Sequence, residues 1–185
     1  MKEFTPTSYT LRCVATGREF PDEGWSLDDP SSQVPSLVRT VYAKRRLEVG
    51  PEDHGIYKFA DWLPVKRMLK GSSAPVTYKS KGLAGYLGLE NLYITFNGYH
   101  PAIGARMTTC SFKETEAYSV CARAEEHTDR VLVVASAGNT ARAFAKVCSD
   151  NRIPLLLSVP ADNFDALWFC LLYTSPSPRD VEESR

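Results

Sequence analysis

The chain has 185 residues, 43% of them hydrophobic and 24% charged, and its 22 lysines and arginines balance 22 aspartates and glutamates. This is a globular composition that can bury a core, and the balanced charge argues against a nucleic-acid partner or an acidic membrane surface. No apolar run is long enough to span a bilayer, and residues 1–10 lack the apolar stretch of a secretory signal. We therefore expect a soluble cytoplasmic protein.

The first part of the chain predicts short strands separated by loops. Strands are predicted at residues 9–13, 74–79 and 92–96, and residues 37–49 begin with β-formers. Between them, Trp62, Leu63, Val65, Met68 and Leu69 predict a short amphipathic helix within residues 55–70. A second short helix is predicted at residues 81–87, ended by Gly88.

The chain from residue 111 onward has a regular alternation of elements. A helix is predicted at residues 111–126, a buried strand at 131–135, a helix at 140–150 and a second buried strand at 154–159. The last three form a βαβ unit, whose strands pair in parallel. The predicted fold class is therefore α/β with parallel βαβ units.

Lys113 is the first candidate functional residue. It follows Ser111 by two positions at a predicted helix start, where Ser111 and Glu114 have the spacing of a capping box. The positive end of the helix dipole favours the neutral amine, which is the form that attacks an aldehyde to make a Schiff base. The alternative is a solvated surface lysine, although helix N-termini ordinarily prefer acids.

A second candidate site is the turn Ser-Ala-Gly-Asn-Thr at residues 136–140. A turn between a strand and a helix presents free backbone N–H groups and the helix dipole, which together suit a carboxylate or a phosphate. The hydroxyls of Ser136 and Thr140 could hold carboxylate oxygens, and Asn139 could bind a ring oxygen. The alternative is an ordinary turn capped by Asn139 or Thr140.

Other positions are weaker candidates. The five cysteines are scattered without a C-x-x-C pair, so neither a disulfide framework nor a metal site is expected, and Cys110 reads as a small buried thiol. Ser72, Ser73 and Lys79 flank a predicted strand start and could touch a substrate phosphate, with turn capping as the alternative.

The end of the chain departs from the pattern before it. Residues 170–180 read codon by codon as a string resembling a sequencing-library adapter, so we interpret residues 170–185 as a non-native tail made of translated adapter. On this interpretation the chain is a C-terminally truncated fragment. The alternative is a flexible tail rich in Ser and Pro.

Between Leu11 and about Trp168 the chain resembles the threonine-synthase-like branch of fold-type II pyridoxal-phosphate enzymes, and within it the cysteate synthases of methanogenic archaea. The Ser-Phe-Lys of residues 111–113 and the Ser-x-Gly-Asn-Thr of residues 136–140 are typical of fold type II as a group. The resemblance to cysteate synthases lies in Trp-Leu-Pro-Val at 62–65 and Thr-Tyr-Lys-Ser at 77–80, with further likeness at 87–94.

The resemblance implies a cofactor, a reaction and a role for each candidate residue. Lys113 would hold pyridoxal 5'-phosphate, Asn139 would contact its 3'-oxygen, and Ser136 and Thr140 would grip the substrate carboxylate. The implied reaction is a β-replacement that converts O-phospho-L-serine and sulfite into L-cysteate and phosphate, toward coenzyme M. Threonine synthase acting on O-phosphohomoserine and a non-catalytic α/β ligand-binding fragment are the alternatives.

The resemblance also implies a domain organisation. Residues 1–50 would be a ribbon-like extension that lacks metal ligands, because only Cys13 stands there. Residues 51–169 would be the N-terminal portion of a fold-type II (tryptophan synthase β-like) catalytic domain, homo-oligomeric at full length. The family's Gly-rich phosphate loop lies further downstream, so we expect the isolated chain to bind the cofactor poorly and to be inactive alone.

Overall fold

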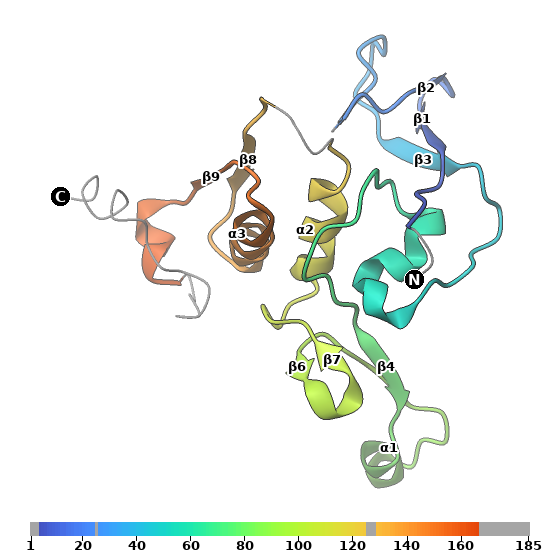
Figure 1. The fold of residues 1–185 in the computed structure, drawn as a ribbon, viewed down its shortest axis with the longest axis vertical. Helices are drawn as coiled ribbons and strands as arrows, with labels where there is room; N and C mark the ends of the chain where they lie inside the picture. Colours follow the sequence, from blue (N-terminus) through green and yellow to red (C-terminus); the bar gives the residue numbers. More distant parts are fainter. Residues whose placement is uncertain (1–3, 25, 125–128, 167–185) are drawn as a thin grey trace.

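The computed structural model describes residues 4–24, 26–124 and 129–166 (Figure 1). Residues 170–185, interpreted as a non-native tail, lie outside this range, so that interpretation stays a prediction. Within the described residues, no helix has both the length and the apolar character needed to cross a membrane.

A three-stranded antiparallel sheet forms the N-terminal part of the structure. Its strands are β1 (Tyr9–Cys13), β2 (Glu19–Phe20) and β3 (Val38–Tyr42), in the order β2-β1-β3. Leu11 is opposite both Phe20 and Thr40, which places β1 in the middle. The strand predicted at residues 9–13 is confirmed.

The amphipathic helix predicted within residues 55–70 is wrong. A 3-10 stretch, η1 (Glu52–Trp62), is broken at Gly55 and ends before Leu63, whose φ of −117° and ψ of 137° are extended. Leu63 precedes Pro64, and a residue before proline is pushed out of the helical region. The following segment runs along α2 instead, where the Lys66 N–H donates to the Ala122 carbonyl at 2.8 Å.

An arm of two hairpins projects from the molecule (Figure 1). In the first hairpin, β4 (Val76–Lys79) pairs antiparallel with β5 (Tyr93–Phe96), and α1 (Gly82–Leu87) connects them. Gly88 ends α1 with a left-handed φ of 67°, as predicted. The second hairpin consists of β6 (Tyr99–His100), η2 (Pro101–Ile103) and β7 (Ala105–Arg106).

The C-terminal described part contains the predicted βαβ unit. After α2 (Lys113–Cys121), β8 (Leu132–Ala135) leads into α3 (Asn139–Asn151) and then into β9 (Leu155–Ser158), before the 3-10 stretch η3 (Ala161–Ala166). The two strands pair in parallel, with Leu132 opposite Leu155. The fold is thus mixed α/β, in which the other three sheets found among the described residues are small and antiparallel.

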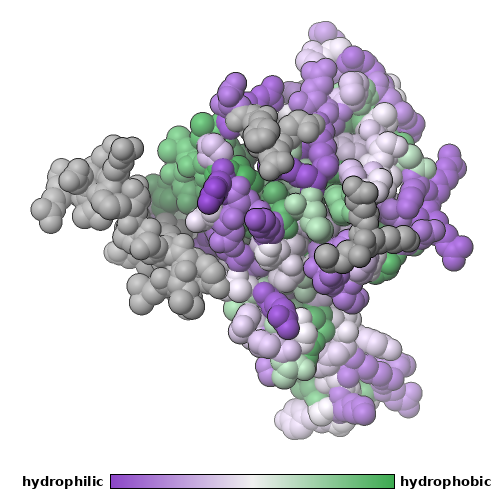
Figure 2. Space-filling model, in the orientation of Figure 1, coloured by the Kyte–Doolittle hydropathy of each residue, from purple (hydrophilic) through white to green (hydrophobic). Residues whose placement is uncertain are grey.

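The two parallel strands are not buried on both faces, contrary to the prediction. Their inward residues, which include Leu132 and Leu155, pack against the core, whereas the alternate side chains of Val133 and Leu156 are 61% and 58% exposed. Alternation follows from the strand geometry, and α3 covers only one face of this two-stranded sheet. Figure 2 shows the resulting hydrophobic area over β8 and β9.

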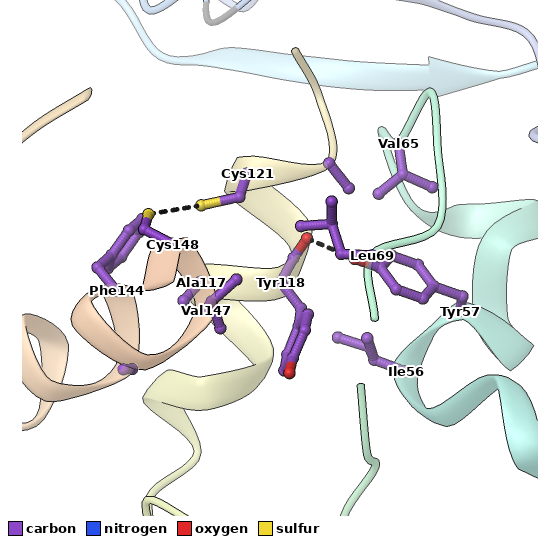
Figure 3. Close-up of a cluster of buried hydrophobic side chains, with 12 residues drawn as sticks. Ile56, Tyr57, Val65, Leu69, Ala117, Tyr118, Cys121, Phe144, Val147 and Cys148 are labelled. Atoms are coloured by element: carbon purple, nitrogen blue, oxygen red, sulfur yellow. Dashed lines mark hydrogen bonds between the residues drawn. The ribbon is translucent and has the colours of Figure 1, made fainter. Parts of the chain in front are cut away.

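The hydrophobic core lies between η1, α2 and α3 (Figure 3). Ala117, Tyr118 and Cys121 of α2 meet Phe144 and Val147 of α3 on one side of α2. On its other side the core contains Ile56, Tyr57, Val65 and Leu69. α2 is therefore held from two sides, which fixes the position of its first residue.

Candidate active site

Lys113 lies in the first turn of a helix, as the sequence predicted, although α2 begins at Lys113 and not at residue 111, and ends at Cys121 and not at residue 126. The predicted capping box is wrong. Phe112 is the N-cap, and the Ser111 hydroxyl accepts the Lys113 N–H at 3.3 Å. The fully buried Glu114 carboxylate accepts the Thr109 N–H at 2.7 Å and the Ser73 hydroxyl at 3.3 Å, so it is engaged away from Ser111.

The amine of Lys113 is held by its own helix. Its Nζ lies 2.7 Å from Glu116 Oε2 and 5.0 Å from the centre of the Phe112 ring. The side chains of Lys113 and Glu116 are 33% and 41% exposed, and exposed pairs of this kind contribute under about 1 kcal/mol. The ion pair can therefore be given up at little cost when the amine bonds to another group.

Helices α2 and α3 lie side by side with their N-terminal ends together. Arg142, in the first turn of α3, donates to the carbonyl of Thr109, just before α2, at 3.3 Å. One turn along each helix, the Lys146 ammonium donates to the Tyr118 hydroxyl at 3.0 Å. Further along, the sulfurs of Cys121 and Cys148 lie 3.7 Å apart (Figure 3). Because these contacts follow the same order along both helices, the N-terminal ends of α2 and α3, which carry the positive ends of the helix dipoles, lie near each other.

The turn before α3 is open to a ligand. Asn139 is the first residue of α3 and Gly138 is its N-cap, so neither Asn139 nor Thr140 caps the helix, and no side chain does. The Ser136 hydroxyl accepts the Gly138 N–H at 3.3 Å. A Cβ built on Gly138 would meet no atom within 4 Å, which leaves space beside the first N–H groups of the helix. Such a helix end can bind an anion.

Arg142 is a functional candidate that the sequence reading missed. Its guanidinium donates to the Thr109 carbonyl and to the Asn139 side-chain oxygen, both at 3.3 Å, and so joins the approach to Lys113 with the start of α3. Its position three residues after Asn139, one helical turn along, was visible in the sequence. Nearby, the hydroxyls of Thr108 and Thr109 are buried without a hydrogen-bond partner in the described structure.

The cysteines differ from the sequence reading in two ways. Cys110, read as a buried thiol, is exposed and has a φ of 53°. Cys121 and Cys148, distant in sequence, form a buried thiol pair between α2 and α3. The hydrogen bond with Cys148, together with burial, raises the pKa of the Cys121 thiol, so this thiol is protonated and serves packing.

A buried lysine sits beside this core and is charged. Burial disfavours the Lys146 ammonium, but hydrogen bonds to the Tyr118 hydroxyl and the Asp150 carboxylate outweigh burial and raise the pKa of Lys146. This ammonium is fully engaged at the middle of α3, so it is a structural group and not a second Schiff-base candidate.

Comparison with curated proteins identifies relatives over most of the chain. The cysteate synthase of Methanoculleus marisnigri is 45% identical over 170 residues, which are 92% of this chain and 38% of that protein. The chain is homologous to cysteate synthase. The cysteate synthase of Methanocella arvoryzae is likewise 45% identical over 86% of the chain, and that of Methanococcoides burtonii is 46% identical over 86%.

The chain spans about 38% of the length of these relatives. No protein-family model matches the chain. No solved structure matches it either. The resemblance stated from the sequence is thus confirmed at the level of homology to cysteate synthases, while the roles of Lys113, Ser136, Asn139 and Thr140 stay predictions.

Proposed function

We propose that this chain is part of a pyridoxal-phosphate enzyme that replaces the phosphate of O-phospho-L-serine with sulfite to give L-cysteate. The observation that carries the proposal is the homology to cysteate synthases at about 45% identity over about nine-tenths of the chain. The candidate site lies at two helix ends, which suit the anionic groups of phosphoserine, sulfite and the cofactor.

The residues at the two helix ends fit the cofactor. A lysine with an ion pair that is easily broken stands at the start of α2, and an uncapped helix start with open space stands at the start of α3. The unpaired hydroxyls of Thr108 and Thr109 lie between Arg106 and Lys113 in the chain and offer further hydrogen bonds. These features suit a molecule that carries an aldehyde and several anionic oxygens.

Each residue has a task in this proposal. Lys113 would hold the cofactor at its aldehyde through Nζ, and as a free amine it would take the proton from the substrate Cα. Asn139 binds the ring 3'-oxygen and is oriented by Arg142. Ser136, Thr140 and the free N–H groups of α3 hold the substrate carboxylate. When bound, the cofactor supplies an electron sink for the Cα carbanion, which lets phosphate leave and sulfite add at Cβ.

We also propose a division of the chain. Residues 51–169 would be the N-terminal portion of a fold-type II catalytic domain, supported by the parallel β8-α3-β9 unit that follows the Lys113 helix. Residues 1–50 would be an extension built on the β1–β3 sheet. The whole protein would be a cytoplasmic homo-oligomer.

The activity is tested by transfer into a full-length relative. Residues 11–166 of this chain would replace the aligned segment of the Methanoculleus marisnigri enzyme, and the hybrid would be given phosphoserine and sulfite. We expect cysteate and phosphate in equal amounts, and their loss in the same hybrid carrying Lys113→Arg. A hybrid that is folded and binds the cofactor, but makes threonine from O-phosphohomoserine and no cysteate, would contradict the proposal.

A further inference from the structure

A pocket of about 680 Å³ lies beside η1. Its walls come from η1, from the segment 72–76 that leads into β4, and from the η2–β7 hairpin. A volume of this size is typical of sites for small molecules. None of Lys113, Ser136, Asn139 and Thr140 lines it, so it is separate from the site described above.

The pocket contains two positive and two negative side chains that differ in how they are satisfied. Lys58 Nζ and Glu52 Oε2 form an ion pair of 2.7 Å and neutralise each other. Asp53 and Arg106 are exposed to solvent, and in the described part of the chain their side chains have neither a hydrogen bond nor an ion pair to another residue. The pocket therefore presents one unmatched carboxylate and one unmatched guanidinium, which suit a ligand that carries both charges.

Serine hydroxyls add hydrogen-bonding capacity to the wall of the pocket. The Ser72 hydroxyl accepts the Ile56 N–H at 3.1 Å, which leaves its own proton to donate into the pocket. The Ser73 hydroxyl donates to Glu114, the residue after Lys113, at 3.3 Å. Of the residues read from the sequence as possible phosphate contacts, Ser72 and Ser73 line the pocket, whereas Lys79 does not and donates to Asn91.

We propose that this pocket binds a small α-amino acid that carries a second, tetrahedral anionic group. Its ammonium lies at Asp53, and its phosphate or sulfonate lies at Arg106 and Ser72. Because Ser73 joins the pocket wall to Glu114, and Glu114 also holds the Thr109 N–H, an occupied pocket acts on the loop before Lys113. The pocket's charges carry this inference, while the choice of O-phospho-L-serine and L-cysteate as ligands rests on the proposed function.

Binding is tested by isothermal titration of the chain, without cofactor, with O-phospho-L-serine, L-cysteate, L-serine and inorganic phosphate. We expect the first two to bind at least tenfold more tightly than the last two. Arg106→Gln should weaken the binding of phosphoserine and of cysteate at least tenfold. Arg106→Lys, in contrast, should keep part of the affinity that Arg106→Gln loses. Asp53→Asn should weaken the binding of O-phospho-L-serine and L-cysteate but not the binding of inorganic phosphate.

Three controls make the result decisive. Arg39→Gln removes an exposed arginine of β3 outside the pocket and should leave binding unchanged. Lys113→Gln should also leave it unchanged, because Lys113 does not line the pocket. Circular dichroism would establish that each variant is folded.

Absence of binding at millimolar ligand, or binding that survives both Arg106→Gln and Asp53→Asn, would overturn the proposal. Binding that is lost in Lys113→Gln would assign the ligand to the other site and would also overturn it. Failure of the proposed enzyme function is seen separately, as absence of cofactor attachment at Lys113.

Discussion

Thr109 and Arg142 are joined by a hydrogen bond of 3.3 Å from a guanidinium nitrogen to the carbonyl oxygen. The loop that leads into Lys113 is thereby tied to the first turn of α3, where the same guanidinium also donates to Asn139. This one side chain therefore contacts both candidate elements.

Arg142→Lys should weaken cofactor binding several-fold with little loss of stability. A lysine keeps the positive charge but cannot donate to Thr109 and Asn139 in the fork geometry of arginine. We expect a fall of about 1 kcal/mol in the free energy of unfolding, because these bonds are partly exposed. Titration of the full-length hybrid with the cofactor, followed by absorbance, checks the affinity, and urea unfolding checks the stability. Unchanged affinity would show that Arg142 does not set the site.

Tyr118→Phe should destabilise the core by roughly 1–3 kcal/mol, the usual cost when a buried polar group loses its partner. The Tyr118 hydroxyl donates to the Lys70 carbonyl at 3.2 Å and accepts from Lys146, whose buried ammonium would keep only Asp150. Urea unfolding measures the effect. Tyr86→Phe, at a side chain that is 85% exposed, is the matched control and should change nothing. Equal stabilities of the two variants would contradict the account.

Gly55→Ala should cost at least ~2 kcal/mol, because a left-handed backbone and a close contact coincide there. Gly55 has a φ of 58°, and a Cβ would lie 2.3 Å from the Ser72 carbonyl oxygen. Gly17→Ala is the control, since Gly17 has a φ of 73° but no atom within 4 Å of a Cβ. Thermal unfolding of both variants separates the contact from the backbone strain. If both lose the same stability, the close approach of η1 to Ser72 is not a constraint.

The sequence predicted the local elements better than their surroundings. Val76–Lys79, Gly82–Leu87 and the βαβ order were readable because periodicity and Gly88 act locally. The helix expected within residues 55–70 does not form, because Pro64 and contacts with α2 outweigh the apolar pattern. Long-range packing produces the same apolar pattern as a helix. The burial expected for β8 and β9 failed because an apolar run does not say how many faces are covered.

The candidate site was only half readable for a similar reason. Lys113 and Asn139 stand out as residue types at helix starts. The contacts that position them involve other segments. The Glu114 carboxylate accepts hydrogen bonds from Ser73 and Thr109, and Arg142 donates to the Thr109 carbonyl. Such contacts depend on how α2 and α3 pack, which spacing within one element does not encode.

Acid should destabilise the fold in part through Asp22. Burial alone would raise the pKa of Asp22, but hydrogen bonds from Tyr9 and Arg123 and the charge of Arg123 outweigh it and lower the pKa. A lowered folded-state pKa means that the ionised carboxylate stabilises the fold above the ordinary aspartate pKa of about 3.9. That stabilisation is lost as the pH falls through the lowered value.

Asp22→Asn should therefore be less stable than the unchanged chain at pH 7, and the difference should shrink as the pH falls below about 4. Urea unfolding across pH 7 to pH 3 measures both curves. Asp28→Asn, at an exposed carboxylate, is the control and should follow the unchanged chain. Curves for Asp22→Asn that stay parallel to those of the unchanged chain would contradict the role assigned to the Asp22–Arg123 contact.

Attachment of the cofactor at Lys113 is the central claim, and reductive trapping tests it most directly. The full-length hybrid that carries residues 11–166 of this chain would be mixed with pyridoxal 5'-phosphate, reduced with borohydride and digested, and the modified peptides would be mapped by mass spectrometry, with Lys113→Arg in parallel. The account predicts that the peptide with Lys113 is modified well above those with the exposed Lys79 and Lys81, and that Lys113→Arg removes this excess without moving it elsewhere. Modification spread evenly over the exposed lysines, with Lys113 no more reactive than they are, would contradict it.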